Sequence, residues 1–292
     1  MLFNTVAHKF NQGSIPKKGC NFFRGSFFAA RPVERSDFGS TFLLLQKSKI
    51  KVLPIFLSFQ LLLATSIAQN IKSGALEIHF IHTANGKEIS LRDSTYTNPF
   101  GETYTVSKLR FYIGQLRVPG SGYKFGEDDY YLVNAANEIP IEISLKPGSY
   151  NGLQFLLGVD SLHNCSGAQT GALDPMNDMF WTWNSGYVMY KLEGTSPAST
   201  ADLNRIEHHV GGYKGENNVA TPIKLTSTQP FRILENKTTV LVIENNLDHY
   251  WKGLNDIKIS DGALIMTPGP LSKKIAANFS NLFTIKGISL NP

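Results

Sequence analysis

Cysteine is scarce in this sequence, which has Cys20 and Cys165 as its two cysteines in 292 residues. Cys20 belongs to a leader described below, so the exported chain keeps Cys165 alone. No internal disulfide framework is therefore expected, even in an oxidising compartment. Two interpretations of Cys165 stay open. A lone cysteine is usually a small buried apolar residue, but Cys165 follows His163 by two positions and is also a candidate metal ligand.

Several motifs of catalysis and cofactor binding are also missing. The sequence has no phosphate-binding Walker loop, no dinucleotide fingerprint, no paired-cysteine zinc site and no Gly-x-Ser-x-Gly elbow. It has no internal repeat and no nucleophile with an evident base partner. Asp160, Asp174 and Asp178 could act as acid–base groups, but carboxylates in a Gly- and Asn-rich loop are more often solvated or bind calcium. We therefore expect a protein without turnover, with a metal-dependent oxidoreductase as the weaker alternative.

Residues 1–68 are predicted to be a targeting segment. A basic stretch, 47–51, precedes an apolar run at 52–65, and Ser66-Ile67-Ala68 offers a small-x-small cleavage site. That order is typical of a secretory signal peptide, and the run is short and interrupted for a membrane span. Export to the periplasm or the extracellular space is favoured over a retained anchor. The preceding residues, to about 45, are interpreted as an over-extended gene start, or alternatively as a disordered cytoplasmic tail.

The charge balance argues against a nucleic-acid partner. The whole chain has 28 Lys and Arg against 23 Asp and Glu, for a net charge of +5. Nine of the basic and two of the acidic residues lie in 1–68, which leaves 19 and 21 and a net charge of −2 for 69–292. Nucleic-acid binding requires a clustered basic face, and here the basic excess belongs to the leader.

Residues 69–292 are predicted to form a single all-β domain, an antiparallel β-sandwich or barrel-like domain with long loops and a short C-terminal helix. Short β-like runs alternate with Gly, Pro, Asn and Asp, as in sandwiches and barrels. The expected strands include 75–82, 103–118, 130–134, 140–145, 153–159, 187–192 and 238–244, and helical periodicity is found at 271–281. The segment 160–178 is a long loop of the kind in which sites tend to lie.

Trp181 and Trp183 stand two apart in the segment 179–194, MFWTWNSGYVMYKLEG. In an extended strand this spacing places both indoles on one face, and Asn184-Ser185-Gly186 supplies a turn before the next alternating run. One interpretation is a pair of buried core aromatics. Another is a stacking platform, shared with Tyr187, for a carbohydrate or a surface.

Histidines are the main candidate metal ligands. His82 ends the apolar face of the first expected strand, whereas His79 lies beside Glu77 on the other face. A hydrogen-bonded core histidine is the alternative role for His82. His208 and His209 are adjacent, so in a strand they point to opposite faces and cannot normally share one metal ion.

The alternation of side chains along the strand and the local sequence motif favour different members of the pair His208 and His209 as the metal ligand. Parity groups His208 with the apolar Ile206 and Val210. The pair Gly211-Gly212 could instead mark a bulge that resets the face and favours His209. Weaker candidates elsewhere in the chain are His249 and His163.

The segment W-T-W-N-S-G-Y, with Leu-Gly-Val-Asp at 157–160 and His-Val-Gly-Gly-Tyr at 209–213, resembles the MbnP-like proteins. These are periplasmic or surface copper-binding proteins related to CorA and MopE of methane oxidisers, and the resemblance spans about 76–288. It implies a copper ion held by histidines, with His209 at the motif position, and by Trp181 or Trp183 oxidised to kynurenine. It also implies a partner dihaem enzyme of the MauG and cytochrome c peroxidase type.

The chain departs from this pattern at two places, since 173–180 contains no histidine and Thr267 follows Met266 where many relatives have histidine. The favoured function is nevertheless an exported copper-binding protein for copper uptake, storage or handling, because imidazole suits both Cu(I) and Cu(II). His82 and His209 are the leading ligands. A carbohydrate- or surface-binding β-sandwich module is the alternative.

The leader generates a first prediction. The mature N-terminus should lie near Gln69, because Ser66-Ile67-Ala68 directly follows the apolar run. N-terminal sequencing of the protein from its native host measures this. A mature chain that retains residues upstream of Val52 would contradict the signal-peptide interpretation.

Overall fold

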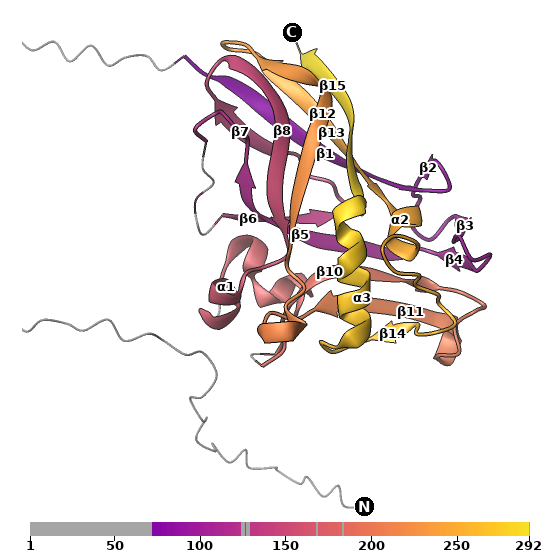
Figure 1. Cartoon of the computed structure of the whole chain (residues 1–292). Coiled ribbons are helices and arrows are strands. Elements are labelled where there is room, and N and C mark those ends of the chain that lie inside the picture. Colours follow the sequence, from indigo (N-terminus) through magenta and orange to yellow (C-terminus); the bar gives the residue numbers. More distant parts are fainter. Residues whose placement is uncertain (1–71, 124–125, 127–128, 168, 183, 292) are drawn as a thin grey trace, which may run out of the picture. The chain divides into compact units, whose positions relative to one another are not determined.

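Two β-sheets packed face to face form most of the described chain (Figure 1). The computed structural model describes residues 72–123, 126, 129–167, 169–182 and 184–291, which belong to one compact unit, Gln69–Pro292. The predicted leader and signal peptide, with Cys20, and Trp183 lie outside the described residues.

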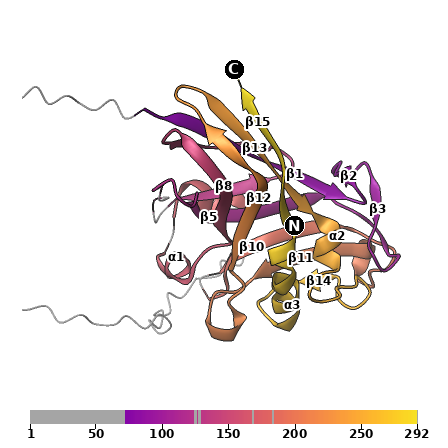
Figure 2. The same ribbon diagram turned by 45° about the horizontal axis from the view of Figure 1, so that its top comes forward.

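The first sheet has five strands and is centred on β1 (Gly74–Ala84). Its order is β15 (Phe283–Asn291), β13 (Thr238–Asn246), β1 and β2 (Lys87–Glu88), and β7 (Ile141–Leu145) also pairs with β1. Burial alternates along β1, with Leu76, Ile78 and Phe80 at most 3% exposed, because successive side chains point to opposite faces. The ends of β1, β13 and β15 meet where the C-terminus lies (Figure 2).

The second sheet has eight strands. Its order is β12 (Thr221–Ile233), β8 (Gly148–Leu157), β5 (Lys108–Arg117), β10 (Gly186–Thr195), β11 (Arg205–Gly211) and β14 (Leu264–Ile265). In addition, β6 (Tyr130–Asn134) pairs with β5 and β9 (Phe180–Thr182) with β10, while β3 (Thr95–Thr97) and β4 (Thr103–Thr105) form a separate hairpin.

Aromatic side chains fill the space between the sheets. The Phe80 ring of β1 meets Phe111 of β5 and Phe155 of β8 edge-on, at centroid distances of 5.6 and 6.3 Å. Phe283 of β15 lies 5.4 Å from Phe111. Edge-to-face contacts of this kind add to the free energy gained from burial, so these rings fix the inner face of each sheet.

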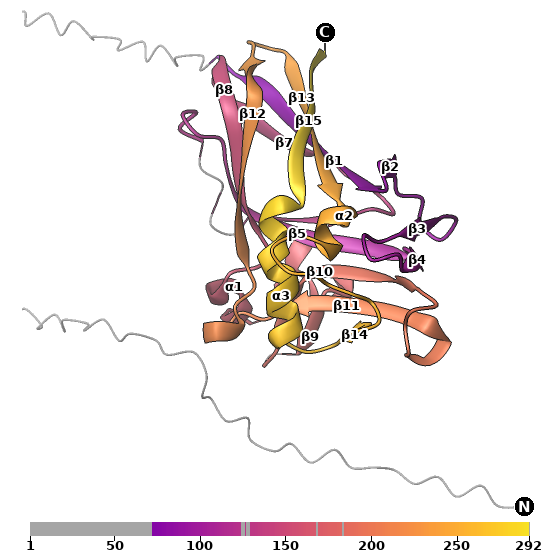
Figure 3. The ribbon, with the colours of Figure 1, turned by 45° about the vertical axis from the view of Figure 1, so that its right-hand side comes forward.

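Helices, rather than the first sheet, cover the inner face of β10 and β11. Figures 1 and 3 both show α3 (Pro270–Asn278) running beside these strands, with α2 (Leu247–Trp251) next to it. Tyr190 of β10 stacks on Tyr250 of α2 at 5.5 Å and meets Phe279, directly after α3, at 5.3 Å. His208 of β11 is buried beneath α2, with its ring 6.0 Å from the Tyr250 ring and 5.7 Å from the Trp251 ring.

The sandwich expected from the sequence is confirmed, with two parallel pairs, β1–β13 and β11–β14, among otherwise antiparallel strands. The expected helix appears as α3 followed by a 3-10 turn, Phe279–Asn281. The expected loop 160–178 contains α1 (Ser161–Cys165) and two 3-10 turns. Within the described residues, none of the helices has the length and apolar character needed to cross a bilayer.

Candidate metal and tryptophan site

The two adjacent histidines of β11 point to opposite faces of the second sheet. His208 shares the buried inner face with Ile206 and Val210, each at most 1% exposed, and its partner in β10 is Leu192. The irregularity expected at Gly211-Gly212 lies instead in β10, between Val188 and Tyr190. The face assignment from strand parity therefore holds, and His209 points outward.

His208 is a fully satisfied core histidine. Its Nε2 lies 2.9 Å from the Gly262 carbonyl oxygen and its Nδ1 lies 2.9 Å from the Tyr250 hydroxyl. Because a carbonyl can only accept, Nε2 carries the proton in the neutral ring and Nδ1 accepts from Tyr250. Burial lowers the pKa of His208 to about 4, which keeps the ring neutral.

His82 also faces the interior but is incompletely bonded. Its Nδ1 lies 3.3 Å from the Asn245 side-chain nitrogen, whose other contact is the Tyr190 hydroxyl at 3.0 Å. The ring lies edge-on to Phe111 at 5.9 Å. Its Nε2 is buried without a hydrogen-bond partner among the described residues, and burial lowers the pKa of His82 to about 4.

His209 on the outer face is held by a carboxylate. Its Nε2 lies 2.9 Å from Glu193 Oε1 of β10. The hydrogen bond from His209, with a further one from Lys108, lowers the pKa of Glu193 to about 2. In the neutral imidazole this bond fixes the proton on Nε2 and leaves the lone pair on Nδ1, the arrangement by which carboxylates orient metal-binding histidines.

A cluster of cations beside Glu193 binds the end of the loop that leads to β9. Lys108 Nζ lies 2.9 Å from Asp178 Oδ2 and 3.1 Å from Glu193 Oε2. Lys191, 2% exposed, reaches Asp178 Oδ1 at 3.1 Å and also donates to the Asp178 carbonyl. Arg110 donates to the Asn177 carbonyl at 3.0 Å. These contacts bind the loop to β5 and β10 immediately before Trp181.

Trp181 lies over the glycine that follows the outward histidine. A Cβ on Gly211 would stand 2.8 Å from Trp181 Cζ3 and 2.7 Å from the Tyr187 carbonyl oxygen, so this close approach requires glycine. Gly211 and His209 are two residues apart in β11 and share its outer face. The Trp181 Nε1 is buried without a hydrogen-bond partner in the described part of the chain. Trp181, Glu193 and His209 thus lie on three adjacent strands.

This arrangement falls within a region that matches a known family. The MbnP family profile matches residues 73–267, which include Trp181, Glu193 and His209. The chain belongs to the MbnP family. Among solved structures, MbnP from Methylosinus trichosporium is similar at 15% identity and a TM-score of 0.45, over 67% of this chain and 84% of that one. No curated protein sequence matches the chain.

Other candidate residues of this MbnP-family chain lie elsewhere. Asp160 caps α1 and accepts from the Tyr130 hydroxyl at 2.9 Å and from His163 Nδ1 at 3.0 Å. Cys165 ends α1, and its role as a metal ligand stays a prediction. His249 is exposed on α2.

Tyr187, expected in an aromatic platform, is buried and cannot stack on a ligand. It is 1% exposed and its hydroxyl donates to the Leu173 carbonyl at 2.6 Å. Trp181 is partly buried in β9, and Trp183 lies outside the described residues. The relative orientation of the two indoles thus stays a prediction, while the platform loses its tyrosine.

The sheet separates the two leading histidines. His82 and His208 lie on the inner side, joined through Asn245, Tyr190 and Tyr250, whereas His209 lies on the outer side. Within the described ranges, no three His, Cys, Asp or Glu side chains are grouped so that they could hold a metal ion. Sequence reasoning missed Lys191 and Glu193, although both stand in the quoted KLEG segment.

Two buried neutral histidines generate a prediction on pH. His82 and His208 have pKa values of about 4 instead of 6.5, so the unfolded chain binds protons at a higher pH than the folded one. Their contribution to folding stability should be complete above pH 6.5 and lost as pH falls toward 4. The loss should reach up to about 3 kcal/mol per histidine. Denaturant titrations across this range measure it.

Matched variants test the origin of this dependence. His82→Leu removes one titrating group while keeping an apolar side chain, and should flatten the stability–pH curve. His249→Gln, at an exposed position, should leave the curve unchanged. A slope unaltered by His82→Leu would contradict the assignment.

Proposed function

We propose that this MbnP-family chain is an exported copper-binding protein, acting in copper uptake, storage or handling without catalytic turnover. Copper is then its cargo. The proposal is supported by family membership and by one observation of geometry, the position of Trp181 on the same outer face as His209.

The unmodified residues fit copper in part. His209 can offer the Nδ1 lone pair, because Glu193 holds the Nε2 proton. The neighbouring cations Lys108 and Lys191 disfavour a second positive charge, but Asp178 and Glu193 lie between them and oppose their charge. A single imidazole is too few for a stable site, so further ligand atoms are needed.

Trp181 is the proposed source of those atoms. The indole Nε1 is a donor without an available lone pair, so an intact tryptophan cannot be a ligand. Ring opening to kynurenine supplies an amine and a carbonyl at a position already held over Gly211. The required oxidant is proposed to be a partner dihaem enzyme of the MauG and cytochrome c peroxidase type.

His82 supports a second candidate position for copper. Its buried Nε2 lacks a hydrogen-bond partner among the described residues, but the sheet separates it from His209. One ion cannot be shared by both histidines in this fold, which makes their single variants informative.

The prediction on copper binding follows from the separation of His82 and His209 by the second sheet. The purified protein should bind about one copper ion, and His209→Ala should remove it while the far-UV spectrum is unchanged. Glu193→Gln should weaken binding by about 10- to 100-fold, since it disturbs the orienting hydrogen bond. Copper content after dialysis against a competing chelator measures both.

His249→Ala is the matched control, because His249 is exposed and lies on α2. It should retain copper fully. Loss of copper in His82→Ala with retention in His209→Ala would contradict the outer-face site and assign the metal to the interior.

A further prediction concerns the tryptophan. Trp181 should be converted to kynurenine, with loss of one carbon and gain of one oxygen, in protein made with its dihaem partner and not in protein made alone. Peptide mass mapping measures this. Trp251, fully buried under the hairpin β3–β4 beside Tyr104, serves as an internal control and should stay intact. Conversion of Trp183 alone would contradict the choice of Trp181.

A further inference from the structure

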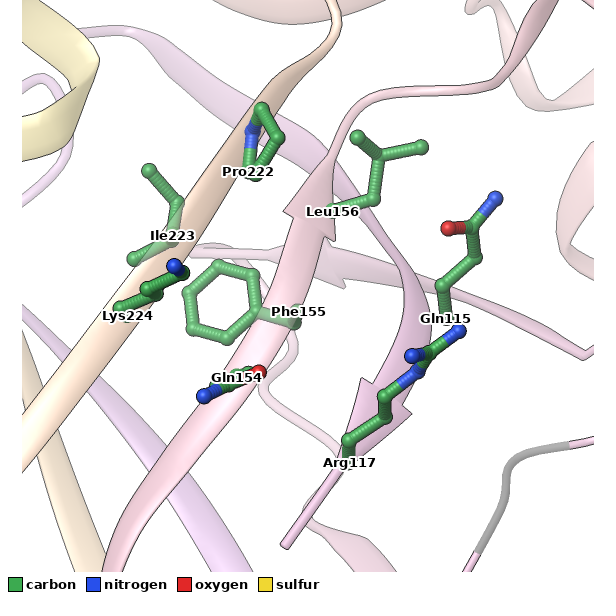
Figure 4. Close-up of a pocket in the computed structure, with 8 residues that line it drawn as sticks. All are labelled: Gln115, Arg117, Gln154, Phe155, Leu156, Pro222, Ile223 and Lys224. Carbon is green, nitrogen blue, oxygen red and sulfur yellow. The ribbon is translucent and has the colours of Figure 1, made fainter. Parts of the chain in front are cut away.

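A groove opens on the outer face of the second sheet, at the end away from β11. It has a volume of about 190 Å³, and Figure 4 shows its side chains coming from three neighbouring strands. The residues with outward side chains that line it are Gln115, Arg117, Gln154, Leu156, Pro222 and Lys224. The strand segments at Phe155 and Ile223, whose side chains are buried in the core, complete the lining.

A β-bulge creates the groove. Gly114 pairs with Leu156 and Arg117 with Gln154, so two residues of β5, Gln115 and Leu116, stand opposite Phe155 alone. Gln115 adopts a φ of 50°, a left-handed conformation that is uncommon for a residue with a side chain. Bulges bend a strand and re-aim its side chains, and here the bulge turns Arg117 back to the outer face.

Two cations and an amide form a row across the strands. Lys224 pairs with Gln154, and Gln154 pairs with Arg117, so all three side chains emerge on one face. Adjacent strands lie about 4.8 Å apart, which places the two cationic residues about 10 Å apart at their Cα atoms. Both side chains are long enough to converge above Gln154.

In the part of the chain that the structure describes, these cations have no counter-charge. Among the described residues, neither Arg117 nor Lys224 makes an ion pair, in contrast to Lys108, Lys191 and Arg205 on the same sheet. On this side of the sheet, Asp160 accepts hydrogen bonds from His163, Tyr130 and Gln115. Two unpaired cations in one row stand out on a chain whose exported part carries more acidic than basic residues.

We infer that the row Lys224–Gln154–Arg117 binds an anionic group, a phosphate, sulfate or carboxylate. The planar guanidinium of Arg117 suits bidentate recognition of such oxygens, Lys224 supplies a second charge, and the Gln154 amide can donate to a further oxygen. Leu156 and Pro222 provide an apolar wall for the carbon skeleton that carries the group. The inference is independent of the proposed copper binding, because the row shares no residue with Trp181, Glu193 or His209.

Binding of inorganic phosphate and of glycerol phosphate to the full chain tests this, measured by calorimetry at low ionic strength. Saturable binding with a Kd of about 1 mM or tighter is expected. The double variant Arg117→Gln/Lys224→Gln should weaken it at least tenfold, and Arg117→Lys should weaken it less, since it keeps the charge and loses the fork. Sedimentation with vesicles containing phosphatidylglycerol asks whether the same group is bound on a lipid surface.

The control is Lys87→Gln/Lys237→Gln, which makes the same change in net charge at two exposed positions outside the groove. It should bind like the unchanged protein. Binding of free anions lost in the groove variant and kept in the control supports a small-molecule ligand, whereas loss of vesicle binding alone supports a headgroup. Equal behaviour of the two double variants, or no saturable binding of either probe by the unchanged chain, overturns the inference.

Discussion

Burial of both faces of β10 is the constraint on which the rest of the structure depends. On the inner side Tyr190 lies between Phe111 and Tyr250. On the outer side Lys191 is buried as well, at 2% exposure, and a buried unpaired charge costs several kcal/mol. Asp178 and Glu193 satisfy it. The loop that carries Asp178 must therefore dock on the sheet for the fold to be stable, and docking brings β9 and Trp181 with it.

The inner side of the same strand has a different polar arrangement. His82, Asn245, Tyr190, Tyr250 and His208 follow one another through hydrogen bonds and ring contacts in the interior. Both histidines are kept neutral by burial, so no charge has to be compensated there. One nitrogen, Nε2 of His82, is left unsatisfied. A buried donor or acceptor without a partner costs about 1–3 kcal/mol, which makes His82 the exception within this series of five residues.

Much of the fold was predictable from period-two alternation, as in β1, where Leu76, Ile78 and Phe80 are buried and His79 bonds Glu77 outside. Alternation also assigned His208 and His209 to their faces. The edge strand β15 was missed because its outer half, which includes Ile288 and Leu290, is exposed and lacks a clear two-sided pattern. The ion cluster could not be derived, since Lys108, Asp178 and Glu193 come together only through the docking of a loop. The groove at Gln115 depends on a bulge, and the one sequence signal for it, Gly114 directly before Gln115, does not predict which side chains the bulge turns outward.

The sequence segments that contain Trp181, Glu193 and His209 lie on neighbouring strands of the second sheet. Trp181 lies on β9, Glu193 on β10 and His209 and Gly211 on β11, and these strands are neighbours in that order. Each piece needs the others, because Gly211 leaves room for the indole, Glu193 orients the imidazole, and Lys191 binds the loop before β9. The spacing of the motif therefore reflects the two connections between three strands. A substitution at Gly211 should consequently affect Trp181, although the two are 30 residues apart in the chain, since a Cβ there would occupy the place of the ring.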